Sequence, residues 1–262
     1  MRATDVVGGR YRLVERLGEG GFGEVWRAEQ LVAGEAVADV AVKGLRAGAD
    51  LREIRLLARL SHPHVLRFRD AFDDDGRLYL VTDLAEGGSA ADLLRTYQGG
   101  VPGPEVARVV REAAEGLAYL HGQRVVHRDV KPANLLFVEG RVVVGDVGLA
   151  KATEHSLSRH SGQGSMAYAA PEMFDGQVGP PSDVYGLAVA AYELLTGRLP
   201  FEGTDKQIMM GHVAKPVVVP EGVSGSWQEL LVGCLVAGQP QRRPRHPPLQ
   251  ARAVGARRTL GS

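Results

Sequence analysis

Residues 125–137 read Val-Val-His-Arg-Asp-Val-Lys-Pro-Ala-Asn-Leu-Leu-Phe and place polar side chains of different chemistry between two apolar runs. Asp129 can accept a proton from an attacking hydroxyl, and Lys131, two residues on, can neutralise a phosphate during its transfer. Asn134 can ligate a hard cation through its amide oxygen. A chance loop rarely combines these side chains in this order, so the stretch predicts a site for phosphoryl transfer.

A second acidic position follows within residues 143–151, which read Val-Val-Gly-Asp-Val-Gly-Leu-Ala-Lys. Asp146 ends an apolar run that is typical of a buried strand. Burying a lone carboxylate is costly unless another group pairs with it. We therefore expect Asp146 to have a partner, which these residues alone do not identify.

A glycine-rich stretch lies further towards the N-terminus, where residues 17–28 contain Gly-x-Gly-x-x-Gly at Gly18, Gly20 and Gly23. Without Cβ atoms, backbone amides can approach a phosphate closely. A purely structural glycine-rich hairpin would fit this motif equally well. A dinucleotide-binding fold would need a helix after the glycines, whereas residues 24–28 read as a strand. The stretch therefore favours a hairpin that covers a ligand.

Lys43 ends the alternating segment Val-Ala-Val-Lys, in which Ala41 and Lys43 share one face of a strand. A small residue and a cation on that face suit a flat base and its phosphates, although a surface lysine on an edge strand is the simpler alternative. Glu53 lies on the apolar stripe of a helix predicted over residues 50–60 and is the candidate partner of Lys43. The alternative is a solvated acid at the edge of the stripe.

The composition excludes several classes of protein. The chain has 262 residues, 44% of them apolar, and its 31 basic and 31 acidic residues leave no net field that would favour nucleic acid or an anionic membrane. The single cysteine excludes an internal disulfide and fits a reducing compartment. We find neither a signal peptide nor an apolar run of membrane-spanning length, so we expect a cytoplasmic protein.

The chain divides after a strand-rich first third. We predict strands at residues 11–17, 24–28, 37–45 and 78–83, and then helices at 104–121 and 182–196 around a small hairpin of residues 135–137 and 142–144. The flexible stretch after Asp83 marks a boundary. We expect a lid-bearing lobe over residues 1–83, a catalytic lobe over 84–244, and a disordered basic tail over 245–262.

These motifs, in this order from about Tyr11 to Pro244, resemble a eukaryotic-type protein Ser/Thr kinase catalytic domain of the branch found in bacteria. The resemblance implies an α+β, bilobal fold, with a small antiparallel β-sheet and one regulatory helix in the N-lobe and a larger, mainly helical C-lobe. It implies ATP and Mg²⁺ as cofactors, and protein Ser/Thr hydroxyls as acceptors. It also implies autophosphorylation through a transient homodimer.

Residue by residue, the resemblance makes Asp129 the catalytic base and places Lys131 at the γ-phosphate. Asn134 and Asp146 would hold the magnesium ion, which is thus the expected partner of Asp146. Lys43 would hold the α- and β-phosphates and be paired by Glu53. The full set of implied cofactor-binding residues is Leu17, Gly18, Gly20, Gly21, Gly23, Val25, Ala41, Lys43, Glu53, Thr82, Asp83, Ala85 and Leu136.

The resemblance also covers the region after Asp146. Ala170-Pro171-Glu172 would close the activation segment, and Arg243 would pair with Glu172. Asp183 would hold the backbone of the catalytic loop. We expect phosphorylation within the activation segment, with a phosphate docking on Arg128. The candidate acceptors are Thr153, Ser156, Ser158 and Ser161, whereas Ser165 is expected to contact Asp129 and Lys131.

Two positions depart from the family pattern. Val147 replaces the usual phenylalanine and fills less volume, so we expect looser packing there. Only ten residues separate Lys43 from Glu53, where the family has nearly twice as many, so we expect a shortened helix and an incomplete ion pair. A catalytically weak nucleotide-binding scaffold is therefore one alternative. A small-molecule phosphotransferase is another, although such relatives generally lack counterparts of Lys131 and of Ala170-Pro171-Glu172.

Overall fold

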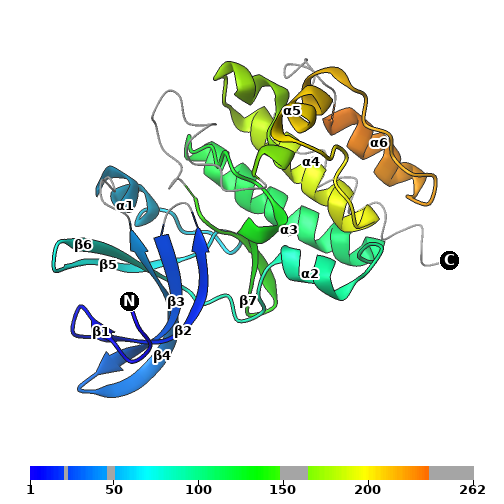
Figure 1. The fold of residues 1–262 in the computed structure, drawn as a ribbon. Helices are drawn as coiled ribbons and strands as arrows, with labels where there is room; N and C mark the ends of the chain where they lie inside the picture. Colours follow the sequence, from blue (N-terminus) through cyan, green and yellow to red (C-terminus); the bar gives the residue numbers. More distant parts are fainter. Residues whose placement is uncertain (21–22, 46–50, 148–164, 236–262) are drawn as a thin grey trace.

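A computed structural model describes residues 1–20, 23–45, 51–147 and 165–235, which form two lobes (Figure 1). The N-lobe is a six-stranded antiparallel sheet in the order β1-β2-β3-β4-β6-β5, with helix α1 beside it. The C-lobe is mainly helical and carries a two-stranded sheet, β7-β8. The predicted bilobal α+β architecture is confirmed.

The N-lobe strands are β1 (Val6–Val7), β2 (Tyr11–Gly20), β3 (Gly23–Val32), β4 (Glu35–Leu45), β5 (Phe68–Asp74) and β6 (Arg77–Thr82). The sequence predicted β2, β3, β4 and β6 but missed β1 and β5. β1 has only two residues. The sequence of β5, Phe-Arg-Asp-Ala-Phe-Asp-Asp, shows no clean alternation, and pairing with β6 supplies its backbone hydrogen bonds.

Strand register places several of the predicted cofactor-binding side chains of the N-lobe on one face of the sheet. Val25 pairs with Lys43, and Lys43 pairs with Leu80, so the three side chains stand in a row across β3, β4 and β6. Ala41 pairs with Thr82 two residues along, on the same face. The neighbours Val40 and Val42 are fully buried on the opposite face. The predicted alternation around Lys43 is confirmed.

Helix α1 spans Leu51–Leu57 and ends three residues earlier than the sequence predicted. Ile54, which the sequence analysis did not single out, is the buried residue that docks α1 on the sheet through Leu45 and Leu80. The helix is therefore short at its C-terminal end, whereas the expected shortening at its N-terminus stays a prediction, because the residues just before Leu51 are not described. Residues 46–50 and the side chain of Glu53 lie outside the part of the chain that the structure describes, and so does the expected Lys43–Glu53 pair.

Two long helices organise the C-lobe, and they lie side by side in Figure 1. The sequence predicted both, α3 and α4, within a few residues. α4 is buried on nearly every side and ends at Gly197, whose φ of 70° is left-handed. The helices are α2 (Ala90–Thr96), α3 (Gly103–Gly122), α4 (Pro180–Thr196), α5 (Asp205–Ala214) and α6 (Gly225–Cys234), with the 3₁₀ turns η1 (Pro132–Asn134), η3 (Ser165–Tyr168) and η4 (Pro171–Asp175).

The hairpin β7-β8 connects the segment that ends at Asn134 to the segment that begins at Gly145, and both contain candidate site residues. β7 spans Leu135–Val138 and β8 spans Arg141–Val144, as the sequence predicted. Glu139 and Gly140 form the turn with φ of 48° and 73°, the positive values that a tight two-residue hairpin requires. Within the described ranges, no helix has the length and apolar content to cross a bilayer.

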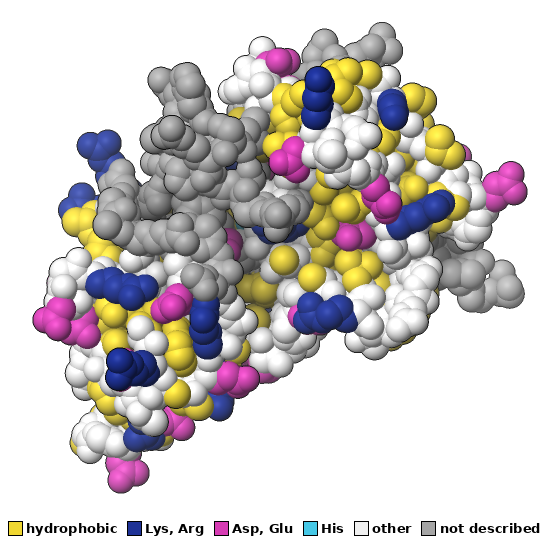
Figure 2. Space-filling view, viewed as in Figure 1, with side chains coloured by type: hydrophobic (Ala, Val, Ile, Leu, Met, Phe, Trp, Pro, Cys, Tyr) yellow, Lys and Arg dark blue, Asp and Glu magenta, His cyan; other side chains and the backbone are white. Residues whose placement is uncertain are grey.

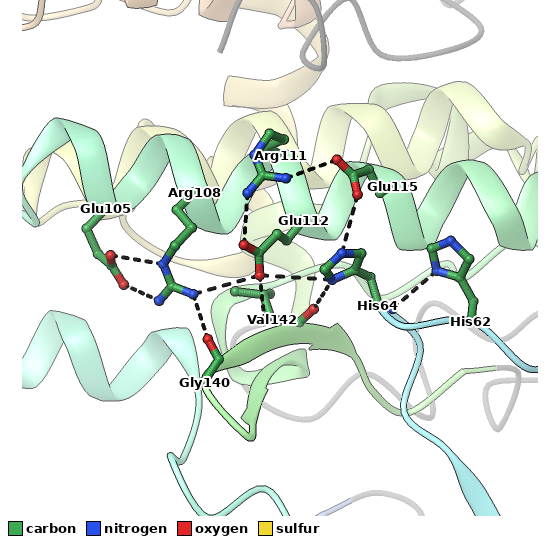
Figure 3. A network of polar contacts seen from close by, with 9 residues as sticks. All are labelled: His62, His64, Glu105, Arg108, Arg111, Glu112, Glu115, Gly140 and Val142. Atoms are coloured by element: carbon green, nitrogen blue, oxygen red, sulfur yellow. Dashed lines mark hydrogen bonds and ion pairs between the residues drawn. The ribbon is translucent and has the colours of Figure 1, made fainter. Parts of the chain in front are cut away.

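A polar network fixes the loop before β5 to this hairpin and to α3 (Figure 3). Glu112 of α3 is buried and accepts a hydrogen bond from the backbone nitrogen of Val142 at 2.8 Å and another from Arg111 at 2.9 Å. His64 lies 2.8 Å through Nδ1 from the carbonyl oxygen of Val142 and 3.3 Å through Nε2 from Glu115. The backbone nitrogen of Val144 donates to the His64 carbonyl. The loop that contains His64 and leads into β5 of the N-lobe is thus held against the C-lobe.

We predict that Glu112→Ala lowers the free energy of unfolding by about 2–4 kcal/mol, because it leaves the buried N–H of Val142 without an acceptor. Glu115→Ala is the matched control: its side chain is 33% exposed, and its loss should cost less than about 1 kcal/mol. Urea denaturation of both variants measures the difference. Equal losses would show that Glu112 contributes no more than a surface ion pair.

Candidate active site

A cavity of about 380 Å³ lies between the lobes. Most of the residues that the sequence assigned to a cofactor or metal line it: Leu17, Gly18, Val25, Ala41, Lys43, Thr82, Asp83, Ala85, Asn134, Leu136 and Asp146. Gly20 pairs with Gly23 at the tip of the β2-β3 hairpin. Gly21, next to it, lies outside the described residues.

The cavity also has lining residues that the sequence analysis missed. Leu80 could have been found, because it shares the sheet face of Lys43 and Thr82. The remaining ones come from loops, helices and the start of β5, whose approach no local pattern shows: Leu57, Leu66, Phe68, Gly88, Ser89, Asp92, Ala133, Gly145 and Val147. Val147, the departure from the family pattern, is buried.

The surroundings of two motif glycines, Gly18 and Gly23, differ. Gly23 has a φ of 132°, and a Cβ atom there would lie 1.9 Å from the carbonyl oxygen of Gly44, so a side chain is excluded by the neighbouring strand. At Gly18 a Cβ atom would meet nothing within 4 Å. The protein's own packing therefore does not demand glycine at Gly18, which lines the cavity. The open space there suits close approach of a ligand to the backbone.

Lys43 and Asp146 form an ion pair across the cavity, with Nζ and Oδ1 2.7 Å apart. Lys43 is buried, whereas the Asp146 side chain is 43% exposed. The prediction of a buried Asp146 carboxylate was wrong, because the chain leaves β8 at Gly145 and turns Asp146 outward with a φ of 54°. Its partner among the described residues is the Lys43 ammonium, and the metal ion that the resemblance implied for Asp146 stays a prediction. Gly148 lies outside the described residues.

A single buried carboxylate holds the backbone of the catalytic loop. Asp183 of α4 accepts hydrogen bonds from the backbone nitrogens of His127 and Arg128, both at 2.8 Å. His121 of α3 lies 2.8 Å from the same carboxylate. Arg128 adopts a φ of 72°, a left-handed conformation that this clamp supports. The role expected of Asp183 is confirmed. Glu172, which was expected to pair with Arg243, accepts a hydrogen bond from the Ser182 hydroxyl, while Arg243 lies outside the described residues.

The three polar residues of the opening motif form one hydrogen-bonded group. Lys131 Nζ lies 2.8 Å from Asp129 Oδ2 and donates to the Ser165 hydroxyl at 2.7 Å. Asn134 Nδ2 donates to the Asp129 backbone oxygen at 2.7 Å and to Oδ2 at 3.1 Å. The expected contacts of Ser165 are thereby confirmed.

The electrostatics of this group keep Asp129 ionised. Burial alone raises the pKa of the carboxyl group, but the Lys131 ammonium and hydrogen bonds from Lys131 and Ser165 outweigh it, and the pKa lies below its ordinary value. At neutral pH Asp129 is therefore a carboxylate, which can accept a hydrogen bond from a hydroxyl group.

The donor atoms that remain fit a divalent cation. Asn134 uses its amide nitrogen on Asp129, and no hydrogen bond to its amide oxygen is found within the described residues. This oxygen and the Asp146 carboxylate are hard donors on the wall of the same cavity. One or two protein oxygens are sufficient for a small cation that takes its other ligands from phosphates.

Comparison with known proteins agrees with this geometry. A family model described as the protein kinase domain matches residues 11–251. The chain belongs to the protein kinase family. The serine/threonine-protein kinase PknF of Mycobacterium tuberculosis is 34% identical over 232 residues, which is 82% of this chain and 47% of PknF. The serine/threonine-protein kinase PkaA of Streptomyces coelicolor is 37% identical over 244 residues, 82% of this chain and 45% of PkaA.

The similarity extends beyond bacteria, since Sporulation-specific protein 1 of Saccharomyces cerevisiae is 33% identical over 245 residues, 89% of this chain and 50% of the yeast protein. The kinase domain spans about half the length of these relatives. The predicted resemblance to bacterial Ser/Thr kinases is confirmed, and the family implies ATP together with a divalent metal ion.

For the cavity, we predict that Asp146→Asn lowers phosphoryl transfer by a factor on the order of 10³, because it removes the anionic oxygen that faces Lys43 and the cation position. The Asp146 carboxylate is partly exposed, so the stability loss should stay below about 1 kcal/mol. Asp83→Asn is the control: it removes a charge from the same cavity, but that charge pairs with Arg69 rather than with Lys43. Comparable activity of the two variants would contradict a role for Asp146.

The lowered pKa of Asp129 generates a prediction about pH. Because the reaction needs the carboxylate, the rate should fall as the pH decreases through this pKa and stay level around neutral pH. Lys131→Met removes the main stabilising charge, so the pKa of Asp129 should rise and the acid limb of kcat/KM should move to higher pH. Lys43→Met removes a cation that pairs with Asp146 and should lower the rate without moving that limb. An unmoved limb in Lys131→Met would show that Asp129 does not set it.

Proposed function

We propose that this domain transfers the γ-phosphoryl group of Mg-ATP to Ser and Thr hydroxyls of protein substrates. The observation that carries the proposal is the hydrogen-bonded group of Asp129, Lys131 and Asn134 beside a nucleotide-sized cavity. Lys43 and Asp146 stand on the wall of the same cavity. Together they supply a base, two cations and two oxygen ligands within one site.

The cavity walls suit the parts of ATP in turn. Val25 and Ala41 on the sheet and Leu136 on β7 are apolar and would enclose the adenine, with the Thr82–Ala85 segment along its edge. Lys43 would bind the phosphates next to the backbone at Gly18. Asn134 and Asp146 would hold Mg²⁺, which when bound neutralises the charge of the phosphates and orients them.

Proton transfer in this proposal depends on Asp129. Its carboxylate accepts a hydrogen bond from the incoming hydroxyl group and orients the oxygen for in-line attack. It takes the proton as the new P–O bond forms and the bond from the γ-phosphorus to the bridging oxygen breaks, which releases ADP. The Lys131 ammonium, which already bridges Asp129 and Ser165, stabilises the charge on the transferred phosphoryl group. Positioning and neutralisation supply most of the catalysis.

The partners follow from the same proposal. Protein substrates are the acceptors, and a transient homodimer would allow one copy to phosphorylate another. We propose no nucleic-acid partner, because acidic and basic side chains are intermingled on the face shown in Figure 2 and the whole chain has no net charge. We assign the domain to the cytoplasm, where ATP is supplied and Cys234 would stay reduced. We propose that the boundary between the two lobes lies between residues 83 and 84.

The proposal is tested with labelled Mg-ATP and dephosphorylated casein, followed by phosphoamino-acid analysis. We expect label on serine and threonine, and none with the Asp129→Asn variant. Mass spectrometry before and after incubation should show phosphate on one or more of Thr153, Ser156, Ser158 and Ser161, which lie outside the described residues. ATP binding without any transfer would instead support the scaffold alternative. Label on tyrosine alone would contradict the acceptor class.

A further inference from the structure

A histidine lies where the loop before β5 meets the C-lobe (Figure 3). The side chain of His64 is only 13% exposed. Its Nδ1 lies 2.8 Å from the carbonyl oxygen of Val142 in β8, and its Nε2 lies 3.3 Å from Oε2 of Glu115 in α3. Oε2 of Glu112 is 3.9 Å from Nδ1. Both nitrogens of the ring therefore face acceptor atoms.

The ring can make both contacts as hydrogen bonds only when each nitrogen carries a proton. A neutral imidazole has one N–H group and one nitrogen lone pair. With the proton on Nδ1, the lone pair of Nε2 faces the Glu115 carboxylate, and with the proton on Nε2, the lone pair of Nδ1 faces the Val142 carbonyl. Each neutral form of His64 thus loses one of the two contacts, and the charged ring keeps both.

The charged groups around the ring leave an anionic oxygen for this proton. Arg111 pairs with Oε1 of Glu112 at 2.9 Å and with Oε1 of Glu115 at 3.1 Å. The oxygens nearest to His64 are the two Oε2 atoms. Arg108 is 3.7 Å from Oε2 of Glu112. For Oε2 of Glu115, no partner other than His64 is found in the part of the chain that the structure describes.

The neighbouring His62 uses its ring in the opposite way. Its Nδ1 accepts a hydrogen bond from the backbone nitrogen of His64 at 3.2 Å, and its ring stacks on Tyr119 with the centroids 4.8 Å apart. Burial and, next, the charge of His64 lower the pKa of His62. An accepting nitrogen carries no proton, so the hydrogen bond and the lowered pKa both indicate a neutral ring. His62 therefore offers a control that does not exchange protons around neutral pH.

The backbone at His64 is joined to the strand that leads to Asp146. The nitrogen of Val144 donates to the His64 carbonyl at 3.0 Å, and the nitrogen of Leu66 donates to the Val144 carbonyl at 3.0 Å. Val144 ends β8, two residues before Asp146. The ring of His64 is thus attached beside the hydrogen bonds that connect the loop of the N-lobe to the active-site strand.

We propose that His64 is a proton-dependent joint between the two lobes. With a proton on each ring nitrogen, it ties the loop before β5 to α3 through Glu115 and to β8 through Val142. Loss of one proton removes one of these contacts and weakens the adjacent hydrogen bonds to Val144. Because the proton favours the contacts, they are complete in acid and are lost as the pH rises. This role goes beyond the proposed kinase function and does not depend on it.

The first test follows the ring protons by NMR in the isotope-labelled domain, between about pH 5 and about pH 9. We expect the His64 ring to titrate in this range and to lose its proton at lower pH in Glu115→Gln, which removes the facing charge. Glu105→Gln is the matched control, because Glu105 lies on the same helix but pairs with Arg108, and it should leave the titration unchanged. A His64 ring that keeps one protonation state throughout, or that titrates identically in Glu115→Gln and wild type, overturns the proposal.

The second test measures amide exchange at Leu66 and Val144 as protection factors, so that the intrinsic effect of pH on exchange cancels. From about pH 6 to about pH 8, protection in the wild type should fall by about threefold, the size expected of a partly exposed ion pair. His64→Gln cannot bind a proton there and should show equal protection at both values. His62→Gln keeps the His64 ring and should retain the fall.

The exchange results separate His64 from other titrating groups. An equal fall in the wild type and in His64→Gln would assign the pH dependence to another residue and refute the joint. Should His64→Gln fail to fold, the ring titration of the wild type and Glu115→Gln still decides the question, since neither protein alters His64.

Discussion

The buried carboxylate of Asp183 is the constraint on which the active site depends. It is fully enclosed in the C-lobe, and its charge is tolerated because two backbone N–H groups and His121 surround it. The same two N–H groups belong to His127 and Arg128, so satisfying the charge also fixes the residues just before Asp129. The left-handed backbone at Arg128 is held by this requirement. Removal of the carboxylate would leave these buried N–H groups without an acceptor, and removal of the donors would leave an uncompensated charge in the core.

The N-lobe half of the site could be predicted because its order is local. Strand alternation decides that Ala41 and Lys43 share a face, and antiparallel pairing then brings Val25 and Thr82 to it. The hairpins and the two long helices could also be predicted, since apolar spacing and turn residues indicate the same element bounds there. The motif of residues 125–137 predicted that Asp129, Lys131 and Asn134 meet, because they are close in the chain. The contact with Ser165 was predicted from the family resemblance.

The rest of the site could not be predicted, because it depends on contacts between distant segments. Asp146 looked buried since its strand is apolar, yet the turn after Gly145 exposes it and brings it to Lys43, 103 residues away. Ser89 and Asp92 reach the cavity only through the placement of α2. β5 lacks an alternation of apolar and polar residues, and its backbone is stabilised by hydrogen bonds to β6. In each case tertiary pairing overrides local pattern.

The two lobes are joined by two kinds of contact, buried hydrogen bonds and a partly exposed ion pair. At the back, backbone hydrogen bonds fasten residues 64–66 to Val144, and buried Glu112 supports the same hairpin. On the side of the cavity, the Lys43–Asp146 ion pair joins the lobes, and the Asp146 side chain is partly exposed. The ammonium of Lys43 and the carboxylate of Asp146 are also the groups that phosphates and a cation would attract. A nucleotide in the cavity would thus replace a direct contact between the lobes with contacts through itself, while the back of the molecule stays closed and acts as the pivot.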